Sequence, residues 1–282
     1  MESLSYESMS APTVSRTPRS SVGPLLQFWR RSRNLSQLAL ATQAGVSSRH
    51  LSFVETGRAN PSREMVLLLA NTLDVPLRER NALLLAAGFA PFYLESSLDA
   101  PGLSAARGAL DAILRQQEPF PAVVLNRHWD ILRTNEAATR FFSWLLGDRR
   151  ARGPANVVRL MFHPDGLRPF VANWPAVAEA LLRRVHREAV GGVPDQATKA
   201  LLAEILDYPD VSQTLRSTDF SAPLLPIVPV SFRKNERAFD FFSTVTTLGT
   251  PQDVTLQEIR IECFFPVNGE TERAARELAM LT

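Results

Sequence analysis

The sequence predicts an all-α N-terminal domain of five helices, followed by an α+β domain whose five-stranded antiparallel sheet carries a helical insertion. Three observations support this division of the 282 residues. Residues 22–90 contain five short segments with the apolar periodicity of helices. Residues 91–103 are rich in Pro, Ser and Gly, which is typical of a linker. In residues 104–282, strand patterns stand on both sides of a long helical stretch.

The composition is that of a globular protein with an ample core, since 45% of the residues are hydrophobic and 21% are charged. Residues 1–21 differ: they are rich in Ser, Thr and Pro without apolar periodicity, so we expect a disordered arm. The sequence has no run of about 18 uncharged apolar residues and no apolar region typical of a signal peptide. Cys263 is the single cysteine, which excludes an internal disulfide and a cysteine-based zinc cluster. We therefore expect a cytoplasmic protein that neither spans a membrane nor is secreted.

The charge is distributed unevenly along the chain. Residues 1–93 contain ten Arg and six acidic residues, a balance of +4; the whole chain carries +2, so the remainder carries −2. A basic segment joined to a slightly acidic one fits a module that binds a polyanion and a second domain with a separate task.

The stretch 35–61 predicts two short helices that meet at a tight turn. Ser36 and Ser47 are good N-cap residues for the two helices. Gly45 ends the first helix and Gly57 the second, because glycine adopts a positive φ without strain. A helix, a glycine turn and a second helix at this spacing form a helix-turn-helix, in which the second helix lies in the DNA major groove.

Three further helices are predicted around this motif, at about 22–33, 62–73 and 76–88. Their buried sides are supplied by Leu25, Leu26, Phe28, Trp29, Met65, Val66, Leu68, Leu69, Leu73, Leu77, Leu83, Leu84 and Leu85. We expect the five helices to pack around one apolar centre.

The second domain begins with a predicted helix, two strands and a further helix. These elements fall at about 104–117, 121–126, 129–134 and from Asn135 onward, two or three helices follow within 154–216, and strands return at 225–232, 237–248 and 254–265 before a terminal helix from 270. Pro226 and Pro229 favour a sheet edge for the first of the three later strands. Two strands, a helical excursion and three strands on one antiparallel sheet is the order of a PAS domain.

Both halves of the chain resemble one family. The run SQLALATQAGVSSRHLSFVETGRANPS resembles the helix-turn-helix of the XRE family, the Cro and phage-repressor type of transcriptional regulator. The marks of that resemblance are Ser36-Gln37, Ala41, Gly45, Glu55-Thr56-Gly57-Arg58 and Asn60-Pro61. The run LDVPLRERNALLLAAGFAP is similar to the MmyB-like members of that family, which join this domain to a PAS-like ligand-binding domain. The C-terminal resemblance rests on WDILRTNEAA, on the spacing of Asn156, Arg159, Phe162 and Trp174, and on TPQDVTLQEIRIECFFP.

The predicted motif defines candidate DNA contacts. These are Gln37, Ser47, Ser48, Arg49, Ser52, Phe53, Arg58 and Asn60. Arg49 is able to pair bidentately with guanine O6 and N7, whereas Arg58 and Asn60 suit contacts to the DNA backbone. The resemblance implies that Gln37 contacts a phosphate or supports the residues that read bases. Because recognition-helix modules generally work in pairs on two half-sites, we expect a homodimer on double-stranded DNA.

The second domain contains candidate ligand-binding residues. These are Phe141, Phe142, Leu145, Arg159, Phe162, His163, Trp174, Phe241 and Ile261. We expect Ile259, Ile261 and Cys263 on the inner face of the sheet, with Phe239 and Phe241 beside them. Arg159 or His163 is the predicted donor to the polar end of a ligand. The resemblance implies an apolar, fatty-acid-like effector, and no cofactor or metal is required.

Two other functions remain possible from the residues. The second domain could be a module for a protein partner or for dimerisation, with no ligand. An enzyme joined to a DNA-binding domain is a third interpretation, but the sequence contains no HExxH, GxSxG, P-loop or GxGxxG motif. His50, His128, His163 and His186 are scattered, and none lies near Cys263 in sequence. We therefore expect a regulator without catalytic activity.

Overall fold

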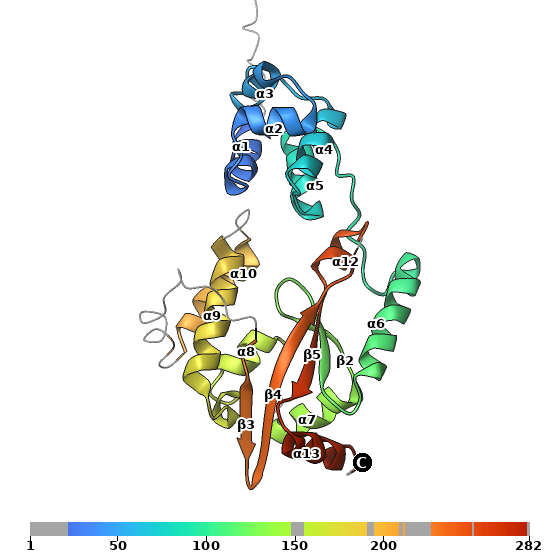
Figure 1. The fold of residues 1–282 in the computed structure, drawn as a ribbon, viewed down its shortest axis with the longest axis vertical. Helices are drawn as coiled ribbons and strands as arrows, with labels where there is room; N and C mark the ends of the chain where they lie inside the picture. Colours follow the sequence, from blue (N-terminus) through green and yellow to red (C-terminus); the bar gives the residue numbers. More distant parts are fainter. Residues whose placement is uncertain are drawn as a thin grey trace, which may run out of the picture. The chain divides into compact units, whose positions relative to one another are not determined.

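The computed structural model describes residues 22–147, 155–190, 195–208, 211, 227–249 and 251–280. The chain divides into two compact units, residues 1–93 and residues 94–282 (Figure 1). The predicted arm, residues 1–21, lies outside the described residues.

Helices are the regular secondary structure of the first unit in its described part, residues 22–93. Its five helices are α1 (Val22–Ser32), α2 (Gln37–Ala44), α3 (Ser48–Glu55), α4 (Arg63–Thr72) and α5 (Leu77–Ala86). Each helix supplies fully buried apolar side chains to one core, among them Leu26, Leu40, Leu51, Leu69 and Leu83. The predicted all-α domain with five helices is confirmed.

The turn between α2 and α3 has the geometry that the sequence predicts. Ser36 and Ser47 cap the two helices, with side-chain oxygens that accept hydrogen bonds from the backbone N–H groups of Ala39 and His50. Gly45 has a φ of 66° and its N–H donates to backbone carbonyls of the last turn of α2. A side chain with a Cβ is strained at that φ, so glycine is the residue that allows the chain to turn here.

The second unit is built on one antiparallel sheet. Among the described residues, its five strands are β1 (Ala122–Leu125), β2 (Ile131–Thr134), β3 (Val230–Lys234), β4 (Arg237–Thr246) and β5 (Arg260–Pro266), in the order β2-β1-β5-β4-β3. β3 lies at an edge, as the prolines before it predict. The predicted strand 254–265 is wrong in its first part, because the helix α12 (Val254–Glu258), capped by Asp253, precedes β5.

Helices cover both faces of this sheet. They are η1 (Pro101–Leu103) with α6 (Ser104–Gln116), and α7 (Glu136–Leu146), α8 (Val157–Phe162), η2 (Arg168–Phe170), α9 (Trp174–Val190), α10 (Gln196–Leu206) and α13 (Gly269–Ala279). α6 packs on one face, where Leu110 and Leu114 meet Val124, Ile261 and Cys263. α7, α8, α9, α10 and α13 supply the larger apolar core on the other face.

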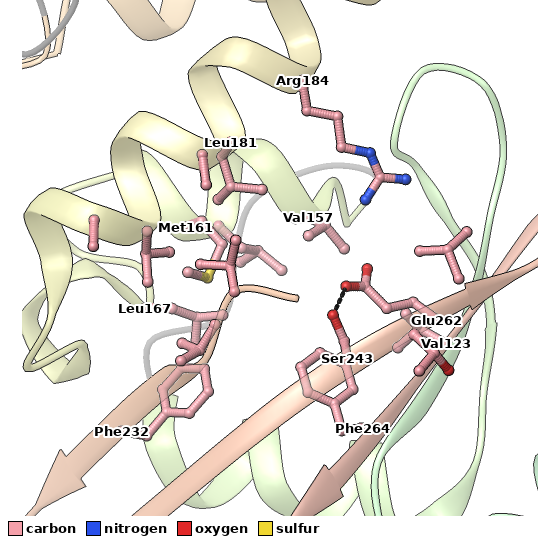
Figure 2. Close-up of a pocket in the computed structure, with 18 of the residues that line it drawn as sticks. Val123, Val157, Met161, Leu167, Leu181, Arg184, Phe232, Ser243, Glu262 and Phe264 are labelled. Carbon is pink, nitrogen blue, oxygen red and sulfur yellow. Dashed lines mark hydrogen bonds between the residues drawn. The ribbon is translucent and has the colours of Figure 1, made fainter. Parts of the chain in front are cut away.

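The orientation of β5 differs from the one predicted. Ile259, Ile261 and Cys263 pack against α6 and therefore lie on the opposite face from Phe239 and Phe241, which belong to the larger core. The predicted placement of Ile261 on the inner face is wrong. Successive side chains of a strand point to opposite faces, so the inner face of β5 carries Glu262 and Phe264 instead (Figure 2).

The segment 91–103, predicted as a linker, is divided between the two units. The Asn81 side chain accepts hydrogen bonds from the backbone N–H groups of Phe92 and Tyr93, which ties them to the first unit. In the second unit the backbone N–H of Ser96 donates to Asp253, and Thr255 Oγ1 donates to the carbonyl of Ser96. The boundary between the units therefore follows Tyr93.

Candidate functional site

The surface of α3 carries most of the residues predicted to contact DNA. Ser47, Ser48 and Arg49 are exposed at its N-terminal end, and Ser52 and Phe53 are half-buried. The guanidinium carbon of Arg49 lies 5.5 Å from the centroid of the Phe53 ring. A cation at this distance from an aromatic ring is attracted to it, which favours this position of Arg49 on the exposed side of the helix.

Arg58 and Asn60 follow α3 and are both exposed. They lie beyond Gly57, whose φ of 70° turns the chain away from the helix. Side chains placed after a recognition helix in this way are suited to contact the DNA backbone, which sets orientation and does not read sequence.

Gln37 is placed differently from the other candidates. Its Nε2 donates a 2.8 Å hydrogen bond to Glu55 Oε2, and Glu55 also accepts from the guanidinium of Arg30. The hydrogen bond from Arg30 to Glu55 raises the pKa of Arg30, although burial opposes it. Gln37 is thus fixed to the end of α3, which is consistent with the predicted role of supporting the recognition helix.

A pocket of about 940 Å³ lies between α8, α9 and the inner face of the sheet (Figure 2). We call it the α9–sheet pocket. Its apolar lining is Val123, Ile131, Phe142, Val157, Leu160, Met161, Leu167, Ala176, Val177, Ala180, Leu181, Val228, Val230, Phe232, Val245 and Phe264. Its polar lining is Glu179, Arg183, Arg184, Ser243, Thr244 and Glu262. A mainly apolar cavity of this size with a few polar groups is characteristic of a small-molecule site.

The polar groups come from both walls of the α9–sheet pocket. On the sheet, Ser243 Oγ of β4 donates a 2.6 Å hydrogen bond to Glu262 Oε1 of β5. On α9, Glu179 and Arg183 form an ion pair of 2.6 Å one helical turn apart. Arg184 follows, and Figure 2 shows its guanidinium extending from α9 toward Glu262 and Ser243.

Arg184 belongs to a cluster of charged groups around Trp129. Its guanidinium carbon lies 4.5 Å from the centroid of the buried Trp129 ring, and that of Arg260 lies 5.2 Å from it. Glu188 accepts from Trp129 Nε1 at 3.0 Å and pairs with Arg260 at 2.9 Å. Burial lowers the pKa of Arg184 and outweighs the negative charge of Glu262, which raises it, while the positive charge of Arg260 acts in the same direction as burial. A partly desolvated cation at the wall of an apolar pocket interacts strongly with a polar group of a ligand.

The aromatic and aliphatic residues predicted to bind the ligand differ in whether they reach the pocket. Phe142 lines the α9–sheet pocket. Phe141, Leu145, Phe162, Trp174 and Phe241 pack within or against the core beside it and do not line it. Phe141 makes edge contacts with Phe232, Phe239 and Phe241, with ring centroids 5.2, 5.2 and 5.5 Å away. The aromatic residues of α7 and β4 are therefore mostly structural.

The residues predicted to hold the polar end of a ligand do not reach the pocket. Arg159 Nε donates to both oxygens of Glu204 on α10, at 2.8 and 2.9 Å. The hydrogen bond from Arg159 lowers the pKa of Glu204. His163 is exposed, and its ring lies 5.4 Å from that of Tyr208. Neither Arg159, His163 nor Ile261 lines the α9–sheet pocket, so for these three the predicted contact with a ligand there is not supported by the geometry.

Sequence reasoning missed the polar lining of the pocket. Glu262 lies on the same face of β5 as Arg260 and Phe264, and Ser243 follows Phe239 and Phe241 on the inward face of β4. A charged residue at an inward strand position is a signal that the sequence contains, but it indicates a site only once that face is known to be covered. Arg184 lies on an amphipathic helix rich in arginine, where the sequence offers no means to select it.

The described residues fit neither a metal centre nor a membrane span. No group of three or more His, Cys, Asp or Glu side chains is arranged to hold a metal ion in the part of the chain that the structure describes. Among the described helices, none combines the length and the apolar character that a membrane span needs.

Two family models match this chain, one in each unit. The family model described as "Helix-turn-helix" matches residues 26–80, and the model described as "MmyB-like transcription regulator ligand binding domain" matches residues 106–278. No curated protein matches the chain. One solved structure, described as "Structure of an RNA-binding Light-Oxygen-Voltage Receptor", is similar at 12% identity and a TM-score of 0.26; the match covers 93% of this chain and 62% of that one.

The two family models assign a function to each unit. α2 and α3 lie within the helix-turn-helix match. All the residues that line the α9–sheet pocket lie within the ligand-binding match. The architecture is that of a ligand-responsive, DNA-binding transcription regulator, and both families are regulatory rather than enzymatic. The chain belongs to the MmyB-like transcription regulators.

Proposed function

We propose that this regulator binds a small apolar, fatty-acid-like effector in the α9–sheet pocket and acts on double-stranded DNA as a cytoplasmic homodimer. The observation that carries the proposal is the pocket itself, about 940 Å³ of mainly apolar space within a ligand-binding domain. Burying an alkyl chain contributes about 0.8 kcal/mol per CH₂, so a chain of about ten carbons supplies roughly 8 kcal/mol before the costs of ordering. Such a ligand would remain bound through purification.

The DNA-binding part of the proposal rests on the exposed end of α3. Arg49 is the side chain there that is able to form a bidentate pair with guanine, and Arg58 is placed to neutralise a phosphate. One helix-turn-helix presents a single recognition helix, and two copies of the chain would present two helices to half-sites about one helical turn apart. A homodimer is therefore the proposed DNA-bound form.

The test is to identify small molecules in the purified, folded protein and to fill the pocket from α9. Ala180 lines the α9–sheet pocket and is half-buried, so Ala180→Phe adds bulk to the cavity without entering the core. We expect mass spectrometry of an extract to detect a single-chain amphiphile in the wild type, and at least tenfold less of it in Ala180→Phe. A displaceable fluorescent acyl probe should show the same loss of affinity.

A matched substitution controls for the added phenyl group. Ala105 is exposed on α6, on the other face of the sheet, so Ala105→Phe should leave ligand content and probe affinity unchanged. If the wild type carries no ligand and binds no acyl probe while its fold is intact, the effector proposal fails. The second unit would then serve as a protein-interaction or dimerisation module without ligand.

A further inference from the structure

Two opposite charges face each other at one end of the α9–sheet pocket and do not pair. Figure 2 shows the Arg184 guanidinium directed from α9 toward the Glu262 carboxylate on β5. Both residues line the pocket, yet no ion pair joins them, whereas Arg183 and Glu179 beside them pair at 2.6 Å. A hydrogen-bond donor and an acceptor are thus held apart on opposite walls of the cavity.

Each of the two groups keeps free hydrogen-bonding capacity. Glu262 accepts from Ser243 Oγ at 2.6 Å, and among the described residues no other side chain or backbone group donates to its carboxylate. The ion pair that Arg184 forms within the described chain is with Glu188, at the long distance of 3.7 Å, and the charge of Glu262 acts on Arg184 across the pocket without a direct contact. A guanidinium has five N–H donors and a carboxylate accepts about four hydrogen bonds. Both groups therefore have positions left for a ligand.

Among the described residues, the polar lining has no excess of positive charge. Two arginines, Arg183 and Arg184, and two glutamates, Glu179 and Glu262, line the pocket, so their charges cancel. The groups immediately behind Arg184 are Glu188 and Arg260, and their charges cancel as well. A site built for an anionic head group is expected to surround it with uncompensated cations or N–H donors. This site does not.

A carboxylate head group can form a hydrogen bond with only one of the two residues, Arg184. Its oxygens accept from Arg184, but an ionised carboxylate has no proton to donate to Glu262. Placed between the two residues, it also brings a second negative charge toward Glu262 in a partly desolvated space. A hydroxyl or a primary amide both accepts and donates, and it carries no charge.

We infer that the α9–sheet pocket selects a single-chain amphiphile with a neutral head group, such as an amide or a hydroxyl, which accepts from Arg184 and donates to Glu262. The free carboxylate of the same chain length is the poorer ligand. This inference rests on the proposed function, since it assumes that an alkyl chain occupies the apolar part of the pocket.

The test compares two compounds that differ only in the head group, decanamide and decanoate, on the full-length protein freed of ligand. Affinity is measured at neutral pH by displacement of a fluorescent acyl probe. We expect decanamide to bind about tenfold more tightly, as expected for one hydrogen bond and one repulsion between like charges. In Glu262→Gln the residue accepts from Ser243 as before and gains N–H donors, so decanoate should bind at least tenfold more tightly than it does to the wild type.

Glu272→Gln serves as the control for a change in total charge. Glu272 lies on α13 and pairs with Arg276 at the surface, so neither ligand should respond to its replacement. If the wild type binds decanoate as tightly as decanamide, or more tightly, the inference is overturned. This comparison uses the wild-type protein alone, so it does not depend on the folding of a variant. An unchanged ratio of affinities in a folded Glu262→Gln variant would also overturn it. If neither compound displaces the probe, or no probe binds, the proposed function fails and the inference fails with it.

Discussion

The guanidinium of Arg30 in α1 holds the carboxylate of Glu55 at the end of α3 through two hydrogen bonds, from Nε to Oε1 at 2.7 Å and from Nη2 to Oε2 at 2.8 Å. The Glu55 side chain is fully buried and that of Arg30 nearly so. Gln37 donates to the same carboxylate. One buried acidic group thus fixes α1, the start of α2 and the end of α3 to each other, and it sets the orientation of the surface proposed to meet DNA.

We therefore predict that Glu55→Ala destabilises the first unit. It leaves the buried guanidinium of Arg30 without its carboxylate, and loss of one partner from a buried pair costs about 3–5 kcal/mol. Amide hydrogen exchange of residues 22–93 should accelerate, and specific DNA binding should fall in parallel. Glu64→Ala removes an acidic residue from the exposed first turn of α4 and should change neither property. Equal effects of both substitutions would contradict the structural role of the pair.

Arg49 and Arg58 should differ in their effects on DNA binding. Arg49→Ala removes the proposed bidentate contact to guanine, so affinity for the specific site should fall by roughly 1–3 kcal/mol while affinity for random DNA changes little. Arg58→Ala removes a phosphate contact, so both affinities should fall together and the slope of log K against log salt should decrease by about 1. Titrations on specific and random duplexes at several salt concentrations separate the two. A uniform loss for Arg49→Ala would remove its assigned role.

Asp195 predicts a pH-dependent contribution to stability. It precedes α10 and contacts Arg127 at 3.1 Å and His128 at 3.0 Å, which joins α10 to the turn between β1 and β2. Burial raises the pKa of Asp195, but hydrogen bonds from Thr198 and Arg127 outweigh burial and hold the pKa below its ordinary value. Because the folded pKa is the lower one, this stabilisation is present above the unfolded pKa of about 3.9 and is lost as the pH falls below it.

The measurement is the difference in melting temperature between the wild type and Asp195→Asn as a function of pH. We expect a difference of several degrees at neutral pH, corresponding to about 1–2 kcal/mol, that shrinks as the pH falls below about 4. Asp207→Asn, at an exposed acidic residue after α10, should show a small difference at every pH. A difference in melting temperature for Asp195→Asn that grew toward acid pH would show that folding does not lower the pKa of Asp195.

Local features of the fold could be predicted from the sequence because their causes are local. Ser36, Ser47 and Asn135 are N-caps whose side-chain oxygens accept from the backbone N–H group three residues later in the chain. Gly45 ends α2 because few other residues adopt a φ of 66°. Each signal needs only a few neighbouring residues, so the five helices and the helix-turn-helix followed from composition, spacing and resemblance.

The pocket could not be predicted in the same way, because its residues are brought together by contacts far apart in the sequence. Alternation along β5 separates Ile261 from Glu262, but it does not say which of the two faces borders a cavity. The sequence pattern predicts the apolar face as the inner one, whereas α6 covers that face and packs it with side chains. Arg159 is a cation close in sequence to aromatic residues, which suggests a donor to a ligand. Its hydrogen-bond partner is instead Glu204, which lies 45 residues away in the sequence.

The two faces of β5 give a final prediction. Ile261 is fully buried against α6, so Ile261→Ala should lower the free energy of unfolding of the second unit by about 2–5 kcal/mol without changing the affinity for an acyl probe. Phe264 lines the α9–sheet pocket and is half-buried, so Phe264→Ala should weaken probe binding about tenfold, at a smaller cost in stability. Chemical denaturation and probe titration on both variants give the two quantities. Weaker probe binding by Ile261→Ala, with binding by Phe264→Ala unchanged, would show that the ligand lies on the α6 face and not in the α9–sheet pocket.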